Sequence, residues 1–417
     1  MAISQADKDV LRRLVSELAQ IAAQGVHKDK AAMWKRVNAL QPERPVVLIF
    51  QIPWHEMNVD DELTCRCSDP WARRLETEFR MQLYQWRHMP GDMIVNDWLW
   101  SPLAIRDTGF GISVDSETRR TDPASSVLSY QWHQQIKEPQ DAEKIKMPVV
   151  TFDRAATEQD YQRRVDIFGD IMPVRKRGTP IFWFAPWDFL IMLWGVEQAM
   201  IDMVMRPDMV NAVMTRLVDA WLCRLAQFEE QNLLSLTHGT DGAGSGGYTF
   251  TGELPGADYD PAHVRPHNMW GGGAAQIFSD ISPEMHWEFA LKHEIRWYER
   301  FGLNYYGCCE PLDGKVDILR HVPDLRKISM SPWIKPERAV RNVGTQYVFS
   351  HKPSPAILAE DRWRPQQARK QLAEVLEAAR GLHVEVILKD ISTVRYEPRR
   401  LWEWEKIAME VVQDYAP

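Results

Sequence analysis

The stretch NYYGCCEP at residues 304–311 has the features of a strand that runs into a reactive loop. Aromatic residues are followed by two adjacent thiols, Cys308 and Cys309, and by the carboxylate of Glu310. The chain has 5 cysteines in 417 residues, and two of them are neighbours here. We expect this strand end to form one wall of an active site at the mouth of a barrel.

Short apolar runs and the helical stretches around them predict the fold. The predicted strands are residues 46–51, 93–98, 180–186, 233–238, 303–308, 326–331, 346–351 and 383–390. The predicted helices are residues 4–24, 72–88, 197–232, 283–300, 336–343, 364–380 and 399–415. Eight strands alternating with helices are typical of a (β/α)8 (TIM) barrel. The sequence therefore predicts one α/β domain over residues 1–417, with an N-terminal helical extension at residues 1–43.

Two segments are predicted as insertions into this barrel. Residues 106–158 are polar with little periodicity, and residues 239–279 are rich in glycine and aromatic residues. The second insertion follows the predicted fourth strand, so we expect it to act as a lid over the site. Its glycine run at 242–247 does not match a phosphate-binding loop.

Composition restricts the classes of partner. A net charge of −8 and a pI near 5.9 argue against nucleic acid as the main partner. The sequence has no apolar run of about 18 residues, so no membrane span is expected. The start of the chain lacks signal-peptide features, and sparse cysteines suit a reducing compartment. We expect a cytoplasmic protein without a membrane partner, which could form a homodimer.

In such a barrel, catalytic residues lie at the carboxyl ends of the strands. The predicted strand ends carry polar or aromatic side chains: Gln51, Asn96, Asp97, Trp187, Asp188, His238, Asp241, Cys308, Glu310, Ser331, Trp333, His351, Lys352, Lys389 and Asp390. From these and nearby residues we predict four catalytic residues, Glu310, Lys389, His351 and Asp390. The predicted substrate-binding residues are Gln51, Trp54, Asn96, Trp187, Tyr306 and Trp333.

Alternation along the strands assigns side chains to faces. Asn304, Tyr306, Cys308 and Glu310 share the more polar face of their strand, which we expect to point into the barrel. Lys389 is expected to point inward by the same argument, opposite an apolar face. A thiolate, a carboxylate and an imidazole suit Zn²⁺, so Cys308, Glu310 and His238 are the predicted ligands, with Cys309 as a substitute. The alternative is a pair of inert core cysteines.

Three segments resemble the uroporphyrinogen decarboxylase superfamily. Residues 275–289 (AQIFSDISPEMHWEF) are similar to its segment ending in S-P-E-x-x-x-x-F, and residues 350–358 (SHKPSPAIL) to its G-N-x-D-P-x-x-L loop. Arg44-Pro45-Val46 looks like the start of its first strand. The resemblance implies a (β/α)8 barrel.

The superfamily's two chemistries differ in their motifs. Its true decarboxylases carry R-Q-A-G-R-Y after the first strand, where this chain has QIPWH at residues 51–55 and neither arginine. Its corrinoid-linked methyltransferases that bind zinc carry H-x-C on the fifth strand and a cysteine on the eighth. Tyr306-Gly307-Cys308 keeps that first cysteine, whereas residues 388–391 (LKDI) contain none. Glu310, His238 or Asp390 could complete the ligand set.

We therefore expect a corrinoid-linked methyltransferase of the O-demethylase type. It would move a methyl group from a small methoxylated compound, suited to an aromatic-lined mouth, to a separate corrinoid protein. Zinc would be held as above, and Lys389 or His351 would stabilise the departing oxygen. The alternatives are a decarboxylase of a small carboxylic acid and a non-catalytic barrel that binds a ligand.

Overall fold

The protein has an α/β architecture. The computed structural model describes residues 3–119 and 128–416. In that part of the chain the helices are α1 (Gln5–Ala22), α2 (Val26–Asn38), α3 (Pro70–His88), α4 (Arg154–Phe168), α5 (Pro186–Trp194), α6 (Val196–Met205), α7 (Pro207–Glu230), α8 (Pro283–His286), α9 (Lys292–Tyr298), α10 (Val316–Leu319), α11 (Pro336–Val343), α12 (Ala356–Ala359), α13 (Pro365–Ala378) and α14 (Arg399–Gln413). The strands are β1 (Val46–Ile49), β2 (Leu99–Pro102), β3 (Ile105–Asp107), β4 (Ser116–Arg119), β5 (Ser129–Trp132), β6 (Val150–Phe152), β7 (Val174–Arg177), β8 (Trp270–Gly273), β9 (Leu303–Tyr306), β10 (Leu325–Met330), β11 (Val348–His351) and β12 (His383–Leu388).

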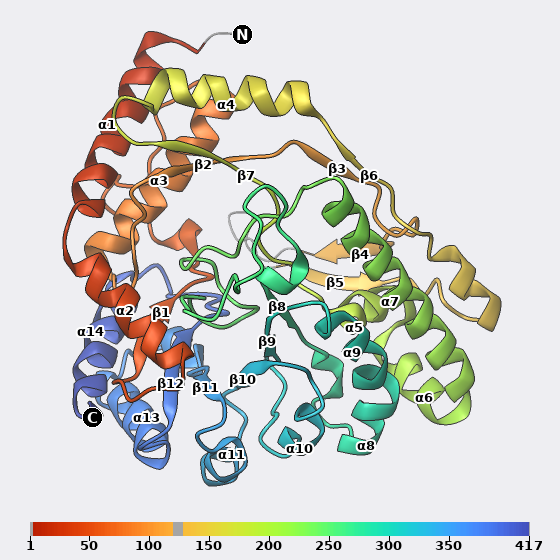
Figure 1. Ribbon diagram of the computed structural model, residues 1–417. Helices are drawn as coiled ribbons and strands as arrows, with labels where there is room; N and C mark the ends of the chain where they lie inside the picture. Colours follow the sequence, from red (N-terminus) through yellow and green to blue (C-terminus); the bar gives the residue numbers. More distant parts are fainter. Residues whose placement is uncertain (1–2, 120–127, 417) are drawn as a thin grey trace.

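Six strands form one parallel sheet in the order β1-β12-β11-β10-β9-β8. Helices α8, α9, α10, α11, α13 and α14 lie on its outer side (Figure 1). Because every pair is parallel, the carboxyl ends of these strands share one edge. Residues that follow β1, β9 and β12 can therefore meet above that edge. A closed barrel stays a prediction.

Single bridges extend the sheet beyond β8. Phe184 pairs in parallel with Gly273, and Thr179 pairs in parallel with Leu234. At the opposite edge, the Asp92 amide donates to the Val47 carbonyl at 2.8 Å. Segments on both sides of the six strands thus run beside them without forming long ladders.

The predictions for the second, third and fourth strands were wrong in their boundaries. Residues 93–96 form no strand, and β2 begins at Leu99 and pairs with β7 in a separate sheet. Residues 180–186 and 233–238 contribute only the single bridges given above. The strand beside β9 is β8, which lies inside the segment predicted as an insertion.

The glycines of β8 explain why its sequence did not look like a strand. A Cβ on Gly271 would lie 2.3 Å from the Asn304 side chain, and one on Gly273 would lie 2.2 Å from the Phe184 carbonyl oxygen. Glycine in a strand often marks such a close approach. The sequence WGGG is therefore required by packing, although it has low strand propensity.

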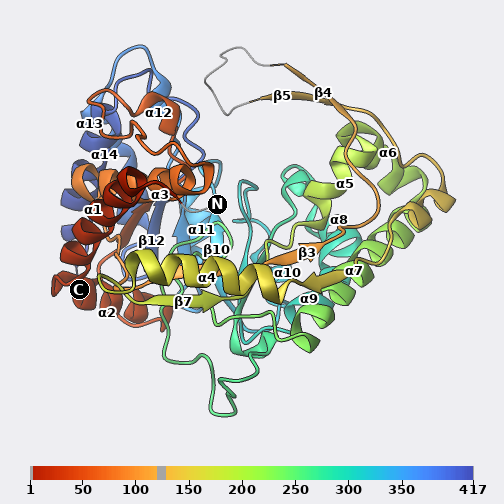
Figure 2. The ribbon, with the colours of Figure 1, turned by 90° about the horizontal axis from the view of Figure 1, so that it is seen from above.

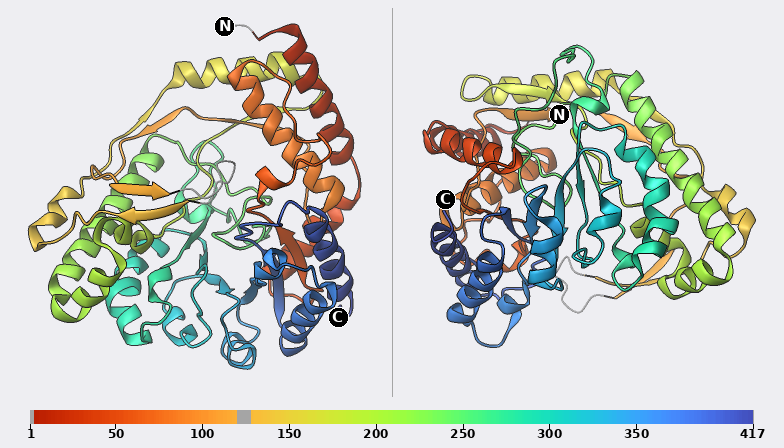
Figure 3. Two further views of the ribbon diagram at one scale, coloured as in Figure 1. Left: turned by 180° about the vertical axis from the view of Figure 1, so that it is seen from behind. Right: turned by 60° about the horizontal axis from the view of Figure 1, so that its bottom comes forward.

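The other predicted insertion, residues 106–158, contains regular structure. β3 pairs with β6 and β4 pairs with β5, both antiparallel. Figure 2 shows the β4–β5 hairpin extending from the α5–α6 side toward the side of α12 and α13. Helix α4 then lies beside α1 (Figure 3, yellow and red).

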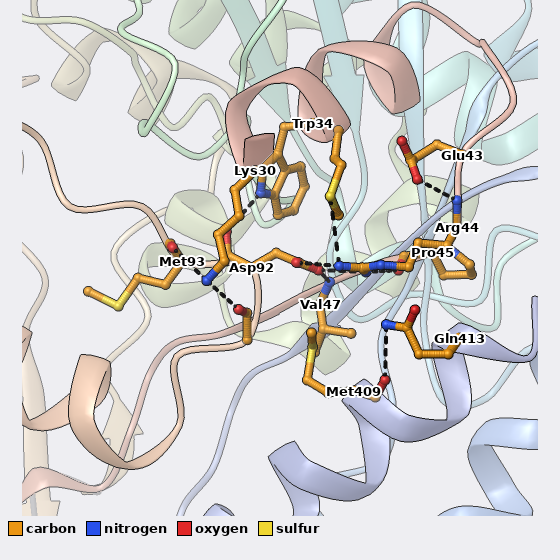
Figure 4. A network of polar contacts seen from close by, with 12 residues as sticks. Lys30, Trp34, Glu43, Arg44, Pro45, Val47, Asp92, Met93, Met409 and Gln413 are labelled. Carbon is orange, nitrogen blue, oxygen red and sulfur yellow. Dashed lines mark hydrogen bonds and ion pairs between the residues drawn. The ribbon is translucent and has the colours of Figure 1, made fainter. Parts of the chain in front are cut away.

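The two N-terminal helices pack against the body of the protein. Trp34 of α2 is fully buried, and its indole N–H donates to the Asp92 carbonyl at 3.0 Å. The Asp92 carboxylate accepts two bonds from Arg44 and one from the Val47 amide, and Lys30 donates to the Met93 carbonyl (Figure 4). This network fixes the entry into β1.

Two large hydrophobic clusters form most of the core. One joins the outer face of the sheet to helices α5 to α14, and the other joins α1, α2 and α3 to β1. Of the 18 tryptophans, six have less than 2% of their surface exposed, so much of the indole content fills the core. Among the described residues, no helix has the length and apolar character needed to cross a bilayer.

Candidate active site

Strand β9 presents the opposite faces from those predicted. The Tyr305 hydroxyl bonds to Ser245 at 2.8 Å, and Lys352 lies 5.4 Å from the Tyr305 ring centre, so Tyr305 points to the inner side. Tyr306 bonds to His286 of α8 at 2.7 Å, and the Asn304 amide donates to the Tyr298 carbonyl of α9. Tyr306 therefore faces the helices and is not placed to bind a substrate. The prediction failed because polarity alone did not identify the inner face.

A left-handed residue breaks the alternation directly after this strand. Gly307 has φ +105°, and its amide donates to the Gly273 carbonyl. A Cβ here would lie 2.4 Å from Leu312 and 2.8 Å from Ser329. The turn directs both Cys308 and Cys309 toward the end of β12.

Two thiols, an ammonium and a carboxylate meet at that point. The Lys389 Nζ donates to Cys308 Sγ at 3.3 Å, to Cys309 Sγ at 3.8 Å and to Asp390 Oδ2 at 2.6 Å. The two sulfurs are 3.5 Å apart, and Cys309 Sγ lies 3.4 Å from Asp390 Oδ2, so its single thiol proton has an acceptor on either side. The inward direction predicted for Lys389 agrees with these contacts.

The charges in this cluster favour a thiolate on Cys308. A hydrogen bond from Cys309 and the positive charge of Lys389 outweigh burial and lower the pKa of Cys308 to about 7. The same bond and burial raise the pKa of Cys309. Burial alone would lower the pKa of Lys389, but Cys308 and Asp390 raise it. The arrangement can therefore hold a thiolate beside a protonated lysine.

Three left-handed residues support the cluster. Gln51 after β1 has φ +56°, Gly307 after β9 has φ +105°, and Asp390 after β12 has φ +57°. The Gln51 side chain accepts a bond from the Asp390 amide at 3.1 Å, which ties the first and last strands together. For the two non-glycine residues, Gln51 and Asp390, this backbone conformation is strained, and such strain concentrates at functional sites.

Glu310 lies beneath the thiols. It is fully buried, and its carboxylate accepts bonds from the amides of Cys308 at 2.9 Å and Ala275 at 3.4 Å. Burial raises its pKa, although these amides oppose the effect. The contacts show a residue that holds the loop after β9 against the loop after β8.

A chain of hydrogen-bonded polar side chains lies on the inner side of the sheet, below the cluster. Lys327 donates to Glu385 at 2.7 Å, Ser350 also donates to Glu385, and Lys352 donates to Ser350. All four residues are at most 3% exposed. Burial lowers the pKa of Lys352 to about 7 despite the charge of Glu385.

His351 of β11 was predicted as a catalytic residue, but Lys352 is the inner residue of the two. His351 is buried on the outer side, beside Pro332, Gln371 and Trp404, and burial lowers its pKa to about 3. Ser350 and Lys352 alternate with it and point inward. The polar sequence Ser-His-Lys at residues 350–352 indicated inward-facing side chains, but it did not show which of the alternating residues face inward.

The glycine-rich segment at 242–248 fills interior space and does not cover the mouth as a lid. Its Ser245 hydroxyl contacts Tyr305 and donates to the Gly307 carbonyl at 3.2 Å. The Gly247 amide donates to Glu385 at 3.0 Å, and a Cβ on Gly247 would lie 2.4 Å from Trp34. The glycines therefore permit close packing against the inner side chains.

His238 belongs to a different group of residues. Its ring lies 4.5 Å from the ring of Trp98 and 5.3 Å from that of Trp100, and its amide donates to Asp241. Asn96 lies two residues before Trp98, and its side-chain amide donates to the Thr240 hydroxyl at 2.8 Å. His238, a predicted zinc ligand, and Asn96, a predicted substrate-binding residue, thus lie in a different group of side chains from the thiol cluster.

The predicted zinc set is not assembled by these residues. In the described ranges, no group of three or more His, Cys, Asp or Glu side chains is placed to hold a metal ion. The positive group beside the sulfurs is the Lys389 ammonium. The donor arrangement does not fit the predicted ligand set, and the presence of zinc stays a prediction for metal analysis.

The remaining predicted binding residues are scattered. Trp187 is fully buried and donates to the Phe289 carbonyl at 2.8 Å, which makes it a core residue. Trp54 packs edge-on against Tyr84, and Trp333 is 73% exposed in the loop after β10. Of the predicted site residues, the structure brings together Gln51, Cys308, Cys309, Glu310, Lys389 and Asp390.

A cavity of about 520 Å³ lies elsewhere, between α1, α2 and residues 94–98. Its lining is mostly apolar, with Asn96, Asp97 and His27 among the polar residues. The thiol cluster is not part of that lining. The thiol cluster is the candidate active site because of its reactive side chains, not because it lies in a large cavity.

Comparison with known proteins adds a likeness of fold. No protein-family profile and no curated protein matches the chain. Among solved structures, the chain is similar to a methyltransferase from Methanosarcina mazei, with a TM-score of 0.50 and 12% sequence identity. The match covers 93% of this chain and 98% of the other. At this identity the similarity describes the fold.

Proposed function

We propose that the protein is a methyltransferase of the corrinoid-linked O-demethylase type, built on a (β/α)8 barrel. The fold likeness to a methyltransferase supports the general activity. The observation that carries the proposal is the meeting of Cys308, Lys389 and Asp390 where parallel strands end. Barrel enzymes carry out their chemistry at that end of the strands.

The order of the strands supports the barrel proposal. β8 to β12 are neighbours in chain order, and the last strand, β12, pairs with the first, β1. Residues 93–96 and 181–184 would supply the two remaining strands of the barrel, since Asp92 bonds to β1 and Phe184 bridges to β8. Eight strands in this order would close the sheet into a barrel.

The side chains of the cluster suit departure of an oxygen from a methyl group. Lys389 would donate a proton to the departing oxygen, and Asp390 would hold the ammonium in position. Gln51 would fix the Asp390 backbone, and Glu310 would fix the loop that carries Cys308. These roles use contacts already described and require no metal step.

The methyl acceptor in this proposal is a corrinoid carried by a partner protein, whose reduced cobalt would supply the nucleophile. The methyl donor is a small methoxylated compound. Exposed Trp333 near the strand ends could contact either an aromatic donor or the partner. Metal analysis of purified protein tests the separate prediction of zinc.

A methyl-transfer assay tests the proposal. Purified protein is incubated with a panel of methoxylated compounds and chemically reduced cobalamin, and methylation of the cobalamin is followed by absorbance. Lys389→Met should lower the rate by about 10²-fold or more, as expected for loss of a general acid. The matched control, Lys370→Met on the exposed face of α13, should keep the wild-type rate.

The second candidate is a decarboxylase of a small acid, and the inner lysines favour it. Lys327 and Lys352 lie below Lys389, with Glu385 as their buried carboxylate partner. An excess of positive charge could hold a substrate carboxylate. Release of carbon dioxide from a panel of small acids, without methyl transfer, would support this function in place of the first. Neither activity across both panels would favour a non-catalytic ligand-binding protein.

A further inference from the structure

We propose that Cys308 and Cys309 form a dithiol site that hydroperoxides oxidise to a disulfide between these two adjacent residues. The inference goes beyond methyl transfer and does not depend on it. It rests on the placement of two sulfurs, one ammonium and one carboxylate at the end of β9.

The geometry favours reaction between the two sulfurs. They are 3.5 Å apart, and both point to the same side of the chain because Gly307 turns the backbone before them. Closing this distance to a disulfide bond requires the sulfurs to approach by about 1.5 Å. Cys308 is 7% exposed and Cys309 is half-buried, so a small oxidant can reach the pair from the Cys309 side.

Lys389 and Asp390 provide the charges for both steps. The ammonium lies 3.3 Å from one sulfur and 3.8 Å from the other, and it stabilises negative charge on either. Cys309 Sγ lies between Cys308 Sγ at 3.5 Å and Asp390 Oδ2 at 3.4 Å, and either can accept its thiol proton. The second thiol is therefore oriented while the first reacts.

The reaction balances with one peroxide. The Cys308 thiolate attacks a peroxide oxygen, an S–O bond forms, the O–O bond breaks, and the departing hydroxide takes the Cys309 proton to become water. The resulting Cys309 thiolate attacks the Cys308 sulfenic sulfur, so the S–S bond forms and the S–O bond breaks. The second hydroxide takes a proton from Lys389, which regains one from solvent. Two thiols lose two electrons, and the peroxide becomes two waters.

The other three cysteines serve as internal references. Cys67 is buried, and burial together with Glu76 raises its pKa to about 12. Cys65 contacts Thr77 at 3.2 Å, and Cys223 accepts a bond from the Gln227 amide. None of these contacts is with a lysine ammonium, so we expect slower oxidation at all three positions.

The test treats full-length protein with dilute hydrogen peroxide, alkylates the free thiols, and maps the peptides by mass spectrometry. In the wild type, the peptide containing residues 308 and 309 should lose two hydrogen atoms, resist alkylation and recover after treatment with dithiothreitol. Cys65, Cys67 and Cys223 should stay reduced and therefore be alkylated. In Cys309→Ser, a sulfenic acid should persist on Cys308 and react with dimedone.

Two charge variants test the role of Lys389. Lys389→Met should slow oxidation of the pair by about tenfold relative to Cys223 in the same molecules, and Lys389→Arg should preserve most of the rate. Circular dichroism verifies that each variant is folded. The proposal is overturned if Cys65 or Cys223 oxidises as fast as the pair, if wild-type Cys308 retains the dimedone adduct, or if the pair is isolated with a bound metal that Cys308→Ser removes.

Discussion

Single residues set the charge inside the sheet. Lys327 and Glu385 form a fully buried ion pair, and Ser350 satisfies a further acceptor of Glu385. Burial raises the pKa of Glu385, but Lys327 and Lys352 lower it by more, so the carboxylate stays charged. Such a pair adds little net stability, yet removing one partner leaves the other as an uncompensated buried charge.

Lys327→Met should therefore destabilise the protein by about 3–5 kcal/mol, because Glu385 would lose its nearest positive partner. Urea unfolding followed by tryptophan fluorescence measures the change. The control is Lys370→Met, which breaks an exposed pair with Glu374 and should change stability by at most about 0.5 kcal/mol. Equal effects of the two substitutions would contradict the assignment of a buried pair.

Lys352 should make stability depend on pH. Its pKa is about 7 in the folded protein against an ordinary lysine value of 10.5, so between these values the unfolded chain binds the extra proton. The free energy of unfolding should then rise with pH from about 7 to about 10, by up to about 1.4 kcal/mol per pH unit from this group. Lys352→Met should remove that part of the slope. Identical slopes in variant and wild type would show that Lys352 keeps an ordinary pKa.

The sequence predicted the thiol cluster better than the inner network. Cys308, Lys389, Asp390 and Gln51 were found because each follows an apolar run that became a strand. Tyr305 was assigned to the wrong face because Asn304 and Tyr306 made the outer face more polar. That polarity has a local cause, since both side chains bond to groups of the covering helices α8 and α9. No sequence pattern distinguishes a helix-facing hydrogen bond from a site.

At the scale of elements, the turn after β9 determines where the thiols lie. Gly307→Ala should destabilise the protein by about 1–3 kcal/mol, because alanine meets both a left-handed φ and two side chains. Thermal unfolding measures the loss.

Gly381→Ala is the matched control for the turn, because Gly381 has φ +81° and open space around it. It should cost only the strain of a positive φ, about 1 kcal/mol. A loss at Gly307 no larger than that at Gly381 would show that the close packing against Leu312 and Ser329 has no energetic weight.

Elements with a clear period or clear caps were predicted well. Helix α11 has the predicted bounds, and Ser4 caps α1 by accepting from the Asp7 amide. Helix α4 was missed because charged residues surround it and leave no apolar stripe. Strand β8 was missed because tertiary packing selects its glycines. Local sequence carries no record of the neighbours that require them.

At the scale of the whole molecule, the N-terminal helices belong to the body of the protein. Trp34 of α2 packs beneath Gly247 and is fully buried, and Arg44 anchors Asp92 beside β1. Residues 1–43 were predicted as an extension because they precede the first strand. The packing of Trp34 shows that α2 closes the inner side of the sheet.

Trp34→Ala should destabilise the protein by about 3–5 kcal/mol, as expected for removing a large buried aromatic side chain. The control Trp333→Ala should have little effect on stability, because that side chain is 73% exposed. Urea unfolding of both variants makes the comparison. A small loss at Trp34 would contradict the close packing of α2 against the interior.

The alkylation rate of Cys308 as a function of pH tests most directly whether β9 and β12 assemble one reactive site. A small thiol reagent and peptide mass spectrometry report this cysteine separately from the other four. We predict an apparent pKa near 7 in the wild type, and an increase of about one unit or more in Lys389→Met, where the ammonium no longer stabilises the thiolate. A Cys308 profile that is the same in both proteins, or a rate no greater than that of buried Cys67, would contradict the account.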